Sequence, residues 1–347
     1  MKKIYLLPVF FSVLSFSQNK TEAKAKVNEG IELHDSRKYD EALAKYDEAL
    51  NLDKDNSLAL TEKAMTLESM KRYDEAIEVS KQVLKLYPED DNRTLYVTYA
   101  NSLDHSNKTD LALKVYDEGL KKYPDYYQLY FNKGISLVNA KENGKAIICF
   151  QKSTKLNPNH SSSYNALSVL DVSNRIASIL ASSRYLVIDN KSARAKGNFD
   201  ALMKLMNKGV SQSGDNSISL SIDSATLDKF NKKKKSENDF SSTDMVLSMS
   251  AALDYDDKNK DKTEVQKFIS KFSTLCQSMS ETQKSQKGYY WEFLAPYFIE
   301  MEKKSLIEPF AYTIFLPSQN PDVILYNKEH SDKIEEFQNW SKNYNWR

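Results

Sequence analysis

Asp257, Asn259 and Asp261 have the spacing of the first three ligands of a calcium-binding loop. Lys262, however, stands where that loop needs glycine, and Phe268 stands where it needs a bidentate glutamate. A solvated turn between two helices explains these acids better. The four histidines are scattered, with no HExxH or paired spacing, so the sequence predicts no metal site.

The sequence also lacks the motifs of common catalytic and nucleotide-binding sites. It contains no GxGxxG, GxxxxGKS/T or GxSxG element, and the segment 209–214 has the wrong spacing for the last of these. We therefore predict that the protein is not an enzyme and uses no cofactor.

Cys149 and Cys276 could form a disulfide or remain two buried thiols, and their places in helical stripes favour buried thiols.

The composition indicates a helix-rich globular protein. Its 347 residues suffice for two or three domains, and only 8 are glycine and 8 proline, fewer than a β-sandwich or barrel needs for its turns. With 49 Lys+Arg against 48 Asp+Glu the chain is nearly neutral, and no nucleic-acid partner is predicted. The four lysines at 232–235 are interpreted as a solvated loop rather than a basic patch, because no aromatic residues interleave with them.

Residues 1–17 have the pattern of a secretory signal peptide. Two lysines precede an apolar run of about 13 residues, 4–16, which is too short to span a bilayer. Ser15 and Ser17 supply the small residues that place cleavage between Ser17 and Gln18. An uncleaved anchor or a buried first helix is the alternative. We predict an exported protein, periplasmic or secreted, with no membrane span after cleavage and a formal charge of −1.

A 34-residue period organises the first half of the chain. Tyr39 recurs as Tyr73, each followed by Asp-Glu-Ala, and further copies follow after shifts of 36 and 34 residues. These shifts define four units, 23–56, 57–90, 93–126 and 127–160.

Each unit repeats one pattern of small, aromatic and apolar residues. Small residues let two antiparallel helices approach closely, a ring fills the space beside the crossing, and a proline ends the second helix. The small residues are Gly30, Ala64, Ala100 and Gly134 in the first helices and Ala42, Ala76, Ala112 and Ala146 in the second; Tyr46, Ser80, Tyr116 and Phe150 come four positions later, Leu33, Leu67, Leu103 and Leu137 recur on the buried side, and Pro88, Pro124 and Pro158 close three units.

This pattern resembles the tetratricopeptide (TPR) repeat. The departures are Lys26 in place of an aromatic residue, Lys54 in place of the first proline and Ser80 in place of a ring. The resemblance implies a mainly all-α fold built as a TPR helix-pair solenoid. Residues 161–194 are interpreted as a degenerate or capping fifth repeat, because Leu180 replaces the small alanine of the second helix.

By this resemblance, the first helices line a concave groove that binds a peptide or helix. The Lys, Asn and Arg side chains that clamp a terminal carboxylate in some TPR proteins are absent here, so an apolar contact is expected. Apolar residues at helical spacing also commonly pack as core, which is the alternative. The positions expected to face the groove are Val27, Ile31, His34, Leu58, Thr61, Met65, Glu68, Val97, Asn101, Asp104, Gln128, Phe131, Ile135 and Val138.

Residues 195–347 are predicted to form a helical C-terminal domain that matches no family of known activity. A polar loop occupies about 208–240, with a short strand or hairpin near 216–223. Helical stripes follow in 241–254, 262–285, 291–301 with a kink at Pro296, 307–315, and from about Ser331. The many aromatic residues suit a ligand box, but the core of a small domain explains them better.

The favoured function is an exported, non-enzymatic scaffold that binds a peptide or helix of an unidentified partner protein in the TPR groove. The alternative is a TPR solenoid that presents a ligand-binding or hydrolase-like C-terminal domain. A self-associating structural repeat protein is the third hypothesis.

Overall fold

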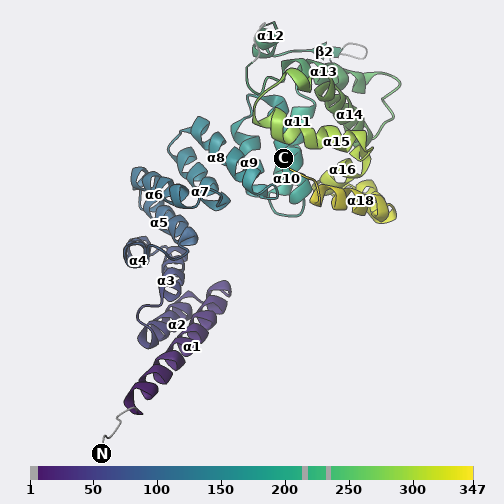
Figure 1. Cartoon of the computed structure of the whole chain (residues 1–347). Coiled ribbons are helices and arrows are strands. Elements are labelled where there is room, and N and C mark those ends of the chain that lie inside the picture. Colours follow the sequence, from purple (N-terminus) through teal and green to yellow (C-terminus); the bar gives the residue numbers. More distant parts are fainter. Residues whose placement is uncertain (1–6, 213–217, 232–235, 347) are drawn as a thin grey trace, which may run out of the picture. The chain divides into compact units, whose positions relative to one another are not determined.

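The computed structural model describes residues 7–212, 218–231 and 236–346 (Figure 1). Residues 1–6 of the predicted export signal and the lysine run 232–235 lie outside the described residues, and for 7–17 the backbone alone is described, as the beginning of helix α1. The chain divides into two compact units, Met1–Cys149 and Phe150–Arg347.

The first unit is a row of paired α-helices (Figure 1). From α1 to α7 each helix packs on the next, and the first helices of adjacent pairs also pack together. This arrangement confirms the predicted helix-pair solenoid. The pairs are α1 (Leu7–Asp35) with α2 (Tyr39–Leu52), α3 (Ser57–Ser69) with α4 (Tyr73–Leu86), α5 (Arg93–His105) with α6 (Thr109–Lys122), and α7 (Tyr127–Asn139) with α8 (Asn143–Leu156), which runs on into the second unit.

The turn inside each pair is built in the same way. One residue adopts the left-handed backbone conformation, and the next N–H bonds to the carbonyl of the repeated leucine, which ends the first helix. In the first pair Arg37 has φ 61°, and the N–H of Lys38 donates to the carbonyl of Leu33 at 2.9 Å. The equivalent left-handed residues are Lys71, Asn107 and Lys141. The repeat seen in the sequence therefore recurs as the same backbone turn in each helix pair.

Small residues bring the paired helices together, as predicted. A Cβ atom on Gly30 would lie 2.4 Å from Cε1 of Tyr46, so the tyrosine ring occupies the space of a side chain. The equivalent alanines of the second helices, Ala42, Ala76, Ala112 and Ala146, are fully buried.

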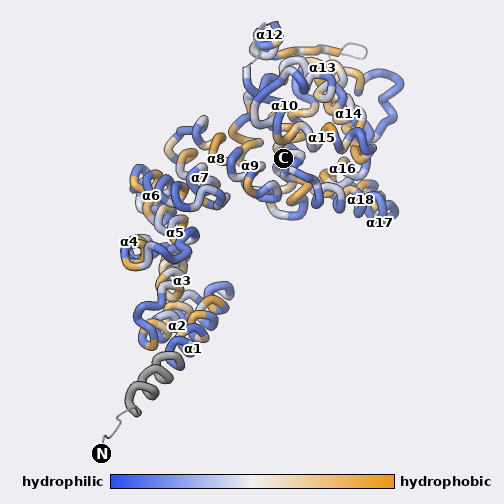
Figure 2. Tube along the Cα trace, in the orientation of Figure 1, coloured by the Kyte–Doolittle hydropathy of each residue, from blue (hydrophilic) through white to orange (hydrophobic). Residues whose placement is uncertain are grey.

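The helices of the first unit are amphipathic. Figure 2 shows hydrophobic and hydrophilic residues around the same helices. In α4, Ala76, Ile77 and Val83 are buried, whereas Lys81 and Lys85 are exposed. Burial of one apolar stripe per helix is what allows successive pairs to stack.

Several other helices of the second unit pack around helix α10. Every residue of α10 from Arg175 to Leu186 is buried, because α9, α11, α13 and α16 all pack on this helix. Leu180, the bulky residue of the predicted fifth repeat, is fully buried there. The helices are α9 (Ser161–Leu170), α10 (Arg175–Ile188), α11 (Ala195–Met206), α12 (Ser224–Asn231), α13 (Ser241–Ala252), α14 (Glu264–Thr282), α15 (Ala295–Lys303), α16 (Ile307–Ile314), α17 (Pro321–Glu329) and α18 (Ser331–Lys342), with short 3₁₀ turns at Leu253–Tyr255, Gln283–Ser285 and Leu316–Ser318.

Two local features refine the sequence expectations. The predicted hairpin consists of β1 (Val210–Gln212) and β2 (Ile218–Leu220), paired antiparallel with Val210 opposite Leu220. Helix α12 lies within the segment predicted as a polar loop. The expected kink is a π-helical turn, η3 (Tyr290–Leu294), directly before α15, where Pro296 has no N–H to donate.

The aromatic side chains of the second unit mostly fill its core. The ring of Phe272 packs against Phe268, Phe298 and Phe310, with centroids 5.3, 5.6 and 4.9 Å away. All four rings are fully buried. These residues are therefore core rather than a ligand box.

Gly30→Ala is expected to lower the free energy of unfolding by about 1–3 kcal/mol, because the new methyl group overlaps the ring of Tyr46. Gly144→Ala is the matched control, since no atom lies within 4 Å of a Cβ there; it should be neutral or mildly stabilising. Urea unfolding measures both changes. Equal effects of the two substitutions would contradict the close-packing account.

Candidate functional site

The predicted groove residues all lie on the first helices α1, α3, α5 and α7, but they differ in exposure. Two are well exposed: Leu58 at 46% and Ile135 at 40%. Ten are half-buried, namely Ile31, His34, Met65, Glu68, Val97, Asn101, Asp104, Gln128, Phe131 and Val138. Val27 and Thr61 are buried, at 0% and 8% exposure.

The two buried positions are unavailable to a partner. Val27 packs in the core of the first helix pair with Ala23 and Tyr46. Thr61 turns its hydroxyl back onto its own helix and donates to the carbonyl of Ser57 at 2.9 Å. The structure thus removes Val27 and Thr61 from the predicted binding surface, because helix packing covers both.

Several polar groove residues link neighbouring helices. The Asp104 carboxylate on α5 accepts hydrogen bonds from the hydroxyls of Thr109 at 2.7 Å and Ser136 at 2.9 Å. Asn101 accepts a hydrogen bond from the buried hydroxyl of Tyr116. Ser136 belongs to α7, so Asp104 joins the first helices of two repeats. The hydrogen bonds of Asp104 and Asn101 therefore tie the first helices to their neighbours.

Two half-buried glutamates, Glu62 and Glu68, lie on α3. Burial raises the pKa of Glu62, and the nearby charge of Asp35 raises it further. Burial also raises the pKa of Glu68, whose Oε1 lies 3.9 Å from Nε2 of His105. The ring of His105 stacks on Tyr73 with centroids 5.0 Å apart. Each of these two carboxylates would therefore favour a cationic group beside it.

An apolar strip remains accessible along the first helices. It consists of Leu58 and Met65 on α3, Val97 on α5, and Phe131, Ile135 and Val138 on α7. We call these six residues the apolar strip. Together with the half-buried Ile31 on α1, these residues are the apolar part of the predicted site that is not fully buried.

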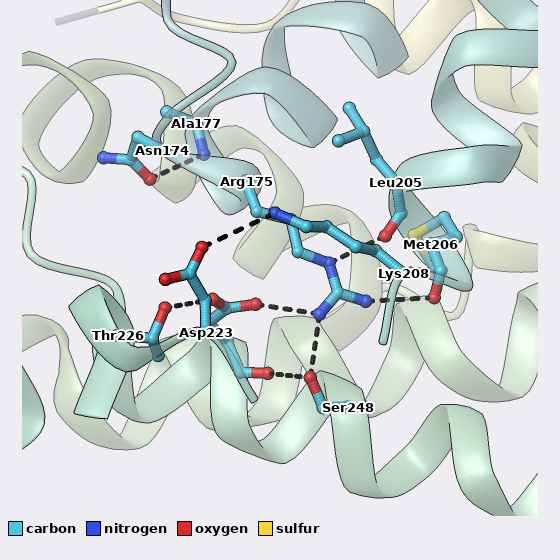
Figure 3. A network of polar contacts seen from close by, with 10 residues as sticks. Asn174, Arg175, Ala177, Leu205, Met206, Lys208, Asp223, Thr226 and Ser248 are labelled. Atoms are coloured by element: carbon cyan, nitrogen blue, oxygen red, sulfur yellow. Dashed lines mark hydrogen bonds and ion pairs between the residues drawn. The ribbon is translucent and has the colours of Figure 1, made fainter. Parts of the chain in front are cut away.

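Sequence reasoning missed a buried arginine that joins three helices of the second unit (Figure 3). Arg175 donates to the carbonyl of Leu205 at 2.7 Å, and so satisfies the end of α11. It also donates to Asp244 at 2.9 Å and Ser248 at 2.8 Å, both on α13. A cation at a helix C-terminus is favourable, and the carboxylate neutralises it. The network is structural.

A second buried arginine lies beside aromatic rings. Arg184 is 1% exposed, donates to Asn159 at 2.8 Å and Ser341 at 2.9 Å, and lies 4.9 Å from the ring centroids of both Tyr297 and Trp346. Cation–π contacts of this kind stabilise a desolvated guanidinium. No spacing in the sequence marks either arginine, because arginine is ordinarily exposed.

The residues weighed for metal and redox chemistry have other roles. In the described ranges, no group of three or more His, Cys, Asp or Glu could hold a metal ion. In the segment whose spacing resembles a calcium loop, the Asn259 amide donates to the carbonyl of Leu253 at 2.8 Å, and Asp257 pairs with Lys260. Cys149 and Cys276 are free and buried, and burial raises the pKa of both thiols.

Among the described residues, no helix is long and apolar enough to cross a membrane.

Comparison with known proteins identifies the repeat region. Residues 31–170 match the family described as Psidin, N-terminal TPR repeats region. A curated relative, "Protein STIP1 homolog" of Dictyostelium discoideum, is 28% identical over 170 residues, which are 40% of this chain and 30% of that protein. The chain therefore spans less than a third of this relative's length.

Solved structures of repeat proteins resemble about half of the chain. PilF of Pseudomonas aeruginosa matches with a TM-score of 0.48 and 16% identity, over 54% of this chain and 84% of that chain. TTC0263, a TPR protein of Thermus thermophilus, matches with a TM-score of 0.45 and 18% identity, over 52% of this chain and 99% of the other.

Glu62→Gln is expected to raise the free energy of unfolding near pH 7 by about a few tenths of a kcal/mol, once solvent screening is allowed for. The raised pKa means that the protonated form stabilises the fold at low pH and that this contribution is lost as pH rises through the folded pKa. The advantage of the variant should therefore disappear below about pH 4.

Urea titrations at several pH values measure this effect. Glu75→Gln is the control, because Arg72 lowers the pKa of that exposed carboxyl, and this variant should show no gain. A gain for Glu62→Gln that is equally large at pH 4 and pH 7 would contradict the electrostatic explanation.

Proposed function

Because residues 31–170 are a TPR region, we propose that the protein is a non-enzymatic scaffold that binds a peptide or helix of a partner protein along its first helices. The observation that carries this proposal is the apolar strip, whose members extend over three successive repeats and include the exposed Leu58 and Ile135. Covering apolar surface is favourable by about 25 cal/mol per Å². A partner segment with apolar side chains would complement the apolar strip, and a basic residue near α1 and α3 would complement Glu62 and Glu68.

Export is the second part of the proposal. Two lysines, the apolar run 4–16 and the small residues Ser15 and Ser17 support a signal peptide that is cleaved before Gln18. The mature scaffold would then act in the periplasm or outside the cell, on another exported protein.

A pocket in the second unit favours the other candidate function, a ligand-binding C-terminal domain presented by the solenoid. The pocket has a volume of about 610 Å³, and Glu292 and Glu300 line it beside aromatic rings. Its size suits a small ligand.

The double substitution Phe131→Asp with Ile135→Asp is expected to weaken partner binding about tenfold or more, because a charge at the centre of an apolar contact is desolvated without a counter-ion. The measurement is affinity capture from native envelopes with quantitative mass spectrometry, after circular dichroism shows an intact fold. Ile148→Asp, on the second helix α8 and 66% exposed, is the matched control. Identical partner sets for the double variant and wild type would exclude the groove proposal.

N-terminal sequencing of the protein isolated from its native cells tests export. We expect a mature chain that begins at Gln18 in the periplasmic or secreted fraction. A cytoplasmic chain that begins at Met1 would contradict the proposal.

A further inference from the structure

The pocket of about 610 Å³ lies between one face of the η3–α15 segment and the end of α18. Glu292, Pro296, Glu300 and Lys304 recur every four residues and so line one side. Trp340 and the segment 343–345 line the other side.

Aromatic rings in this pocket are held firmly in place. Tyr344 meets Trp340 edge-to-face, with centroids 5.5 Å apart. Behind them, Tyr297 is fully buried, packs 4.9 Å from Trp340, and shares a 2.7 Å hydrogen bond with the hydroxyl of Ser341. Rings fixed in this way lose little entropy when a ligand stacks on them.

The polar groups of the pocket include negative and positive charges, and both hydrogen-bond donors and acceptors. Glu300 accepts one hydrogen bond from the indole N–H of Trp340 at 3.3 Å, and Glu292 accepts one from the N–H of Gly288 at 3.0 Å. The Lys304 ammonium and the Asn345 side chain make no hydrogen bond with any residue that the structure describes. The pocket therefore offers acceptors and unengaged donors beside flat apolar surfaces.

We propose that this pocket binds a neutral saccharide, an inference that rests on the second candidate function, a ligand-binding C-terminal domain. A sugar ring has a flat C–H face for Trp340 or Tyr344, and each hydroxyl both donates and accepts, which matches the mixture of carboxylate, amide and ammonium groups. The ammonium of Lys304 in the lining disfavours a purely cationic ligand. An anionic ligand is disfavoured by Glu292 and Glu300. The site is separate from the apolar strip of the first unit.

Isothermal titration of the full-length protein with glucose, maltose, cellobiose, N-acetylglucosamine and its β-1,4 disaccharide tests the proposal. At least one of these sugars should bind with a millimolar or lower Kd, and saturation-transfer NMR should show the strongest signals on its ring C–H protons. Tetramethylammonium and acetate are the charged probes and should not bind. Failure of every sugar, or binding of tetramethylammonium alone, would overturn the proposal.

Two neighbouring lysines provide a matched pair of variants. Lys304→Ala removes the unengaged ammonium and should weaken sugar binding about tenfold, whereas Lys303→Ala changes an exposed residue that does not line the pocket. Both lysines are exposed, so both variants should keep the fold. Equal affinities for the two variants would place the sugar elsewhere and contradict the proposal. Trp340→Phe, which keeps a core ring, should weaken binding about threefold through its smaller stacking face.

Discussion

The close approach of two helices within each pair is the constraint on which the first unit depends. At Gly30 the ring of Tyr46 occupies the space that a Cβ would need, and the alanines of the second helices are fully buried. A left-handed residue and one hydrogen bond to the repeated leucine then reverse the chain at the same point of every pair. Because each pair buries only one side, the next pair must stack on it. Most of the predicted groove residues on the first helices are left half-buried or exposed.

The second unit is packed around one buried central helix instead of as a row of helix pairs. Helix α10 is buried from Arg175 to Leu186, and both of its arginines donate hydrogen bonds inside the protein. Arg175 satisfies the end of α11 and pairs with Asp244, while Arg184 lies beside Tyr297 and Trp346. Unpaired, such cations would strongly destabilise a buried site. The same aromatic group that surrounds Arg184 also positions Trp340 at the pocket, so core packing and the proposed sugar site share one set of rings.

The sequence predicted the helix pairs well, because their signal recurs four times and depends on side-chain size. It also predicted that α18 begins near Ser331, and it predicted a kink at Pro296, close to which the π-helical turn η3 lies. It could not show that Val27 and Thr61 are buried. An apolar helical face in a sequence can either pack on a neighbouring helix or bind a partner, and only the positions of the neighbouring helices distinguish the two. Arg175 and Arg184 were missed for a related reason: their hydrogen-bond partners lie 25 to 157 positions away in the chain, beyond any local pattern.

The central claim is that a partner protein contacts the first helices. Site-specific photocrosslinking in native cells tests it directly, with a photoreactive phenylalanine analogue at Ile135 or at Ile148, both of which are exposed. The account predicts that position 135, in the apolar strip, yields a discrete crosslinked protein and that position 148, on a second helix, does not. Equal crosslinking at both positions, or crosslinking at position 148 alone, would contradict it.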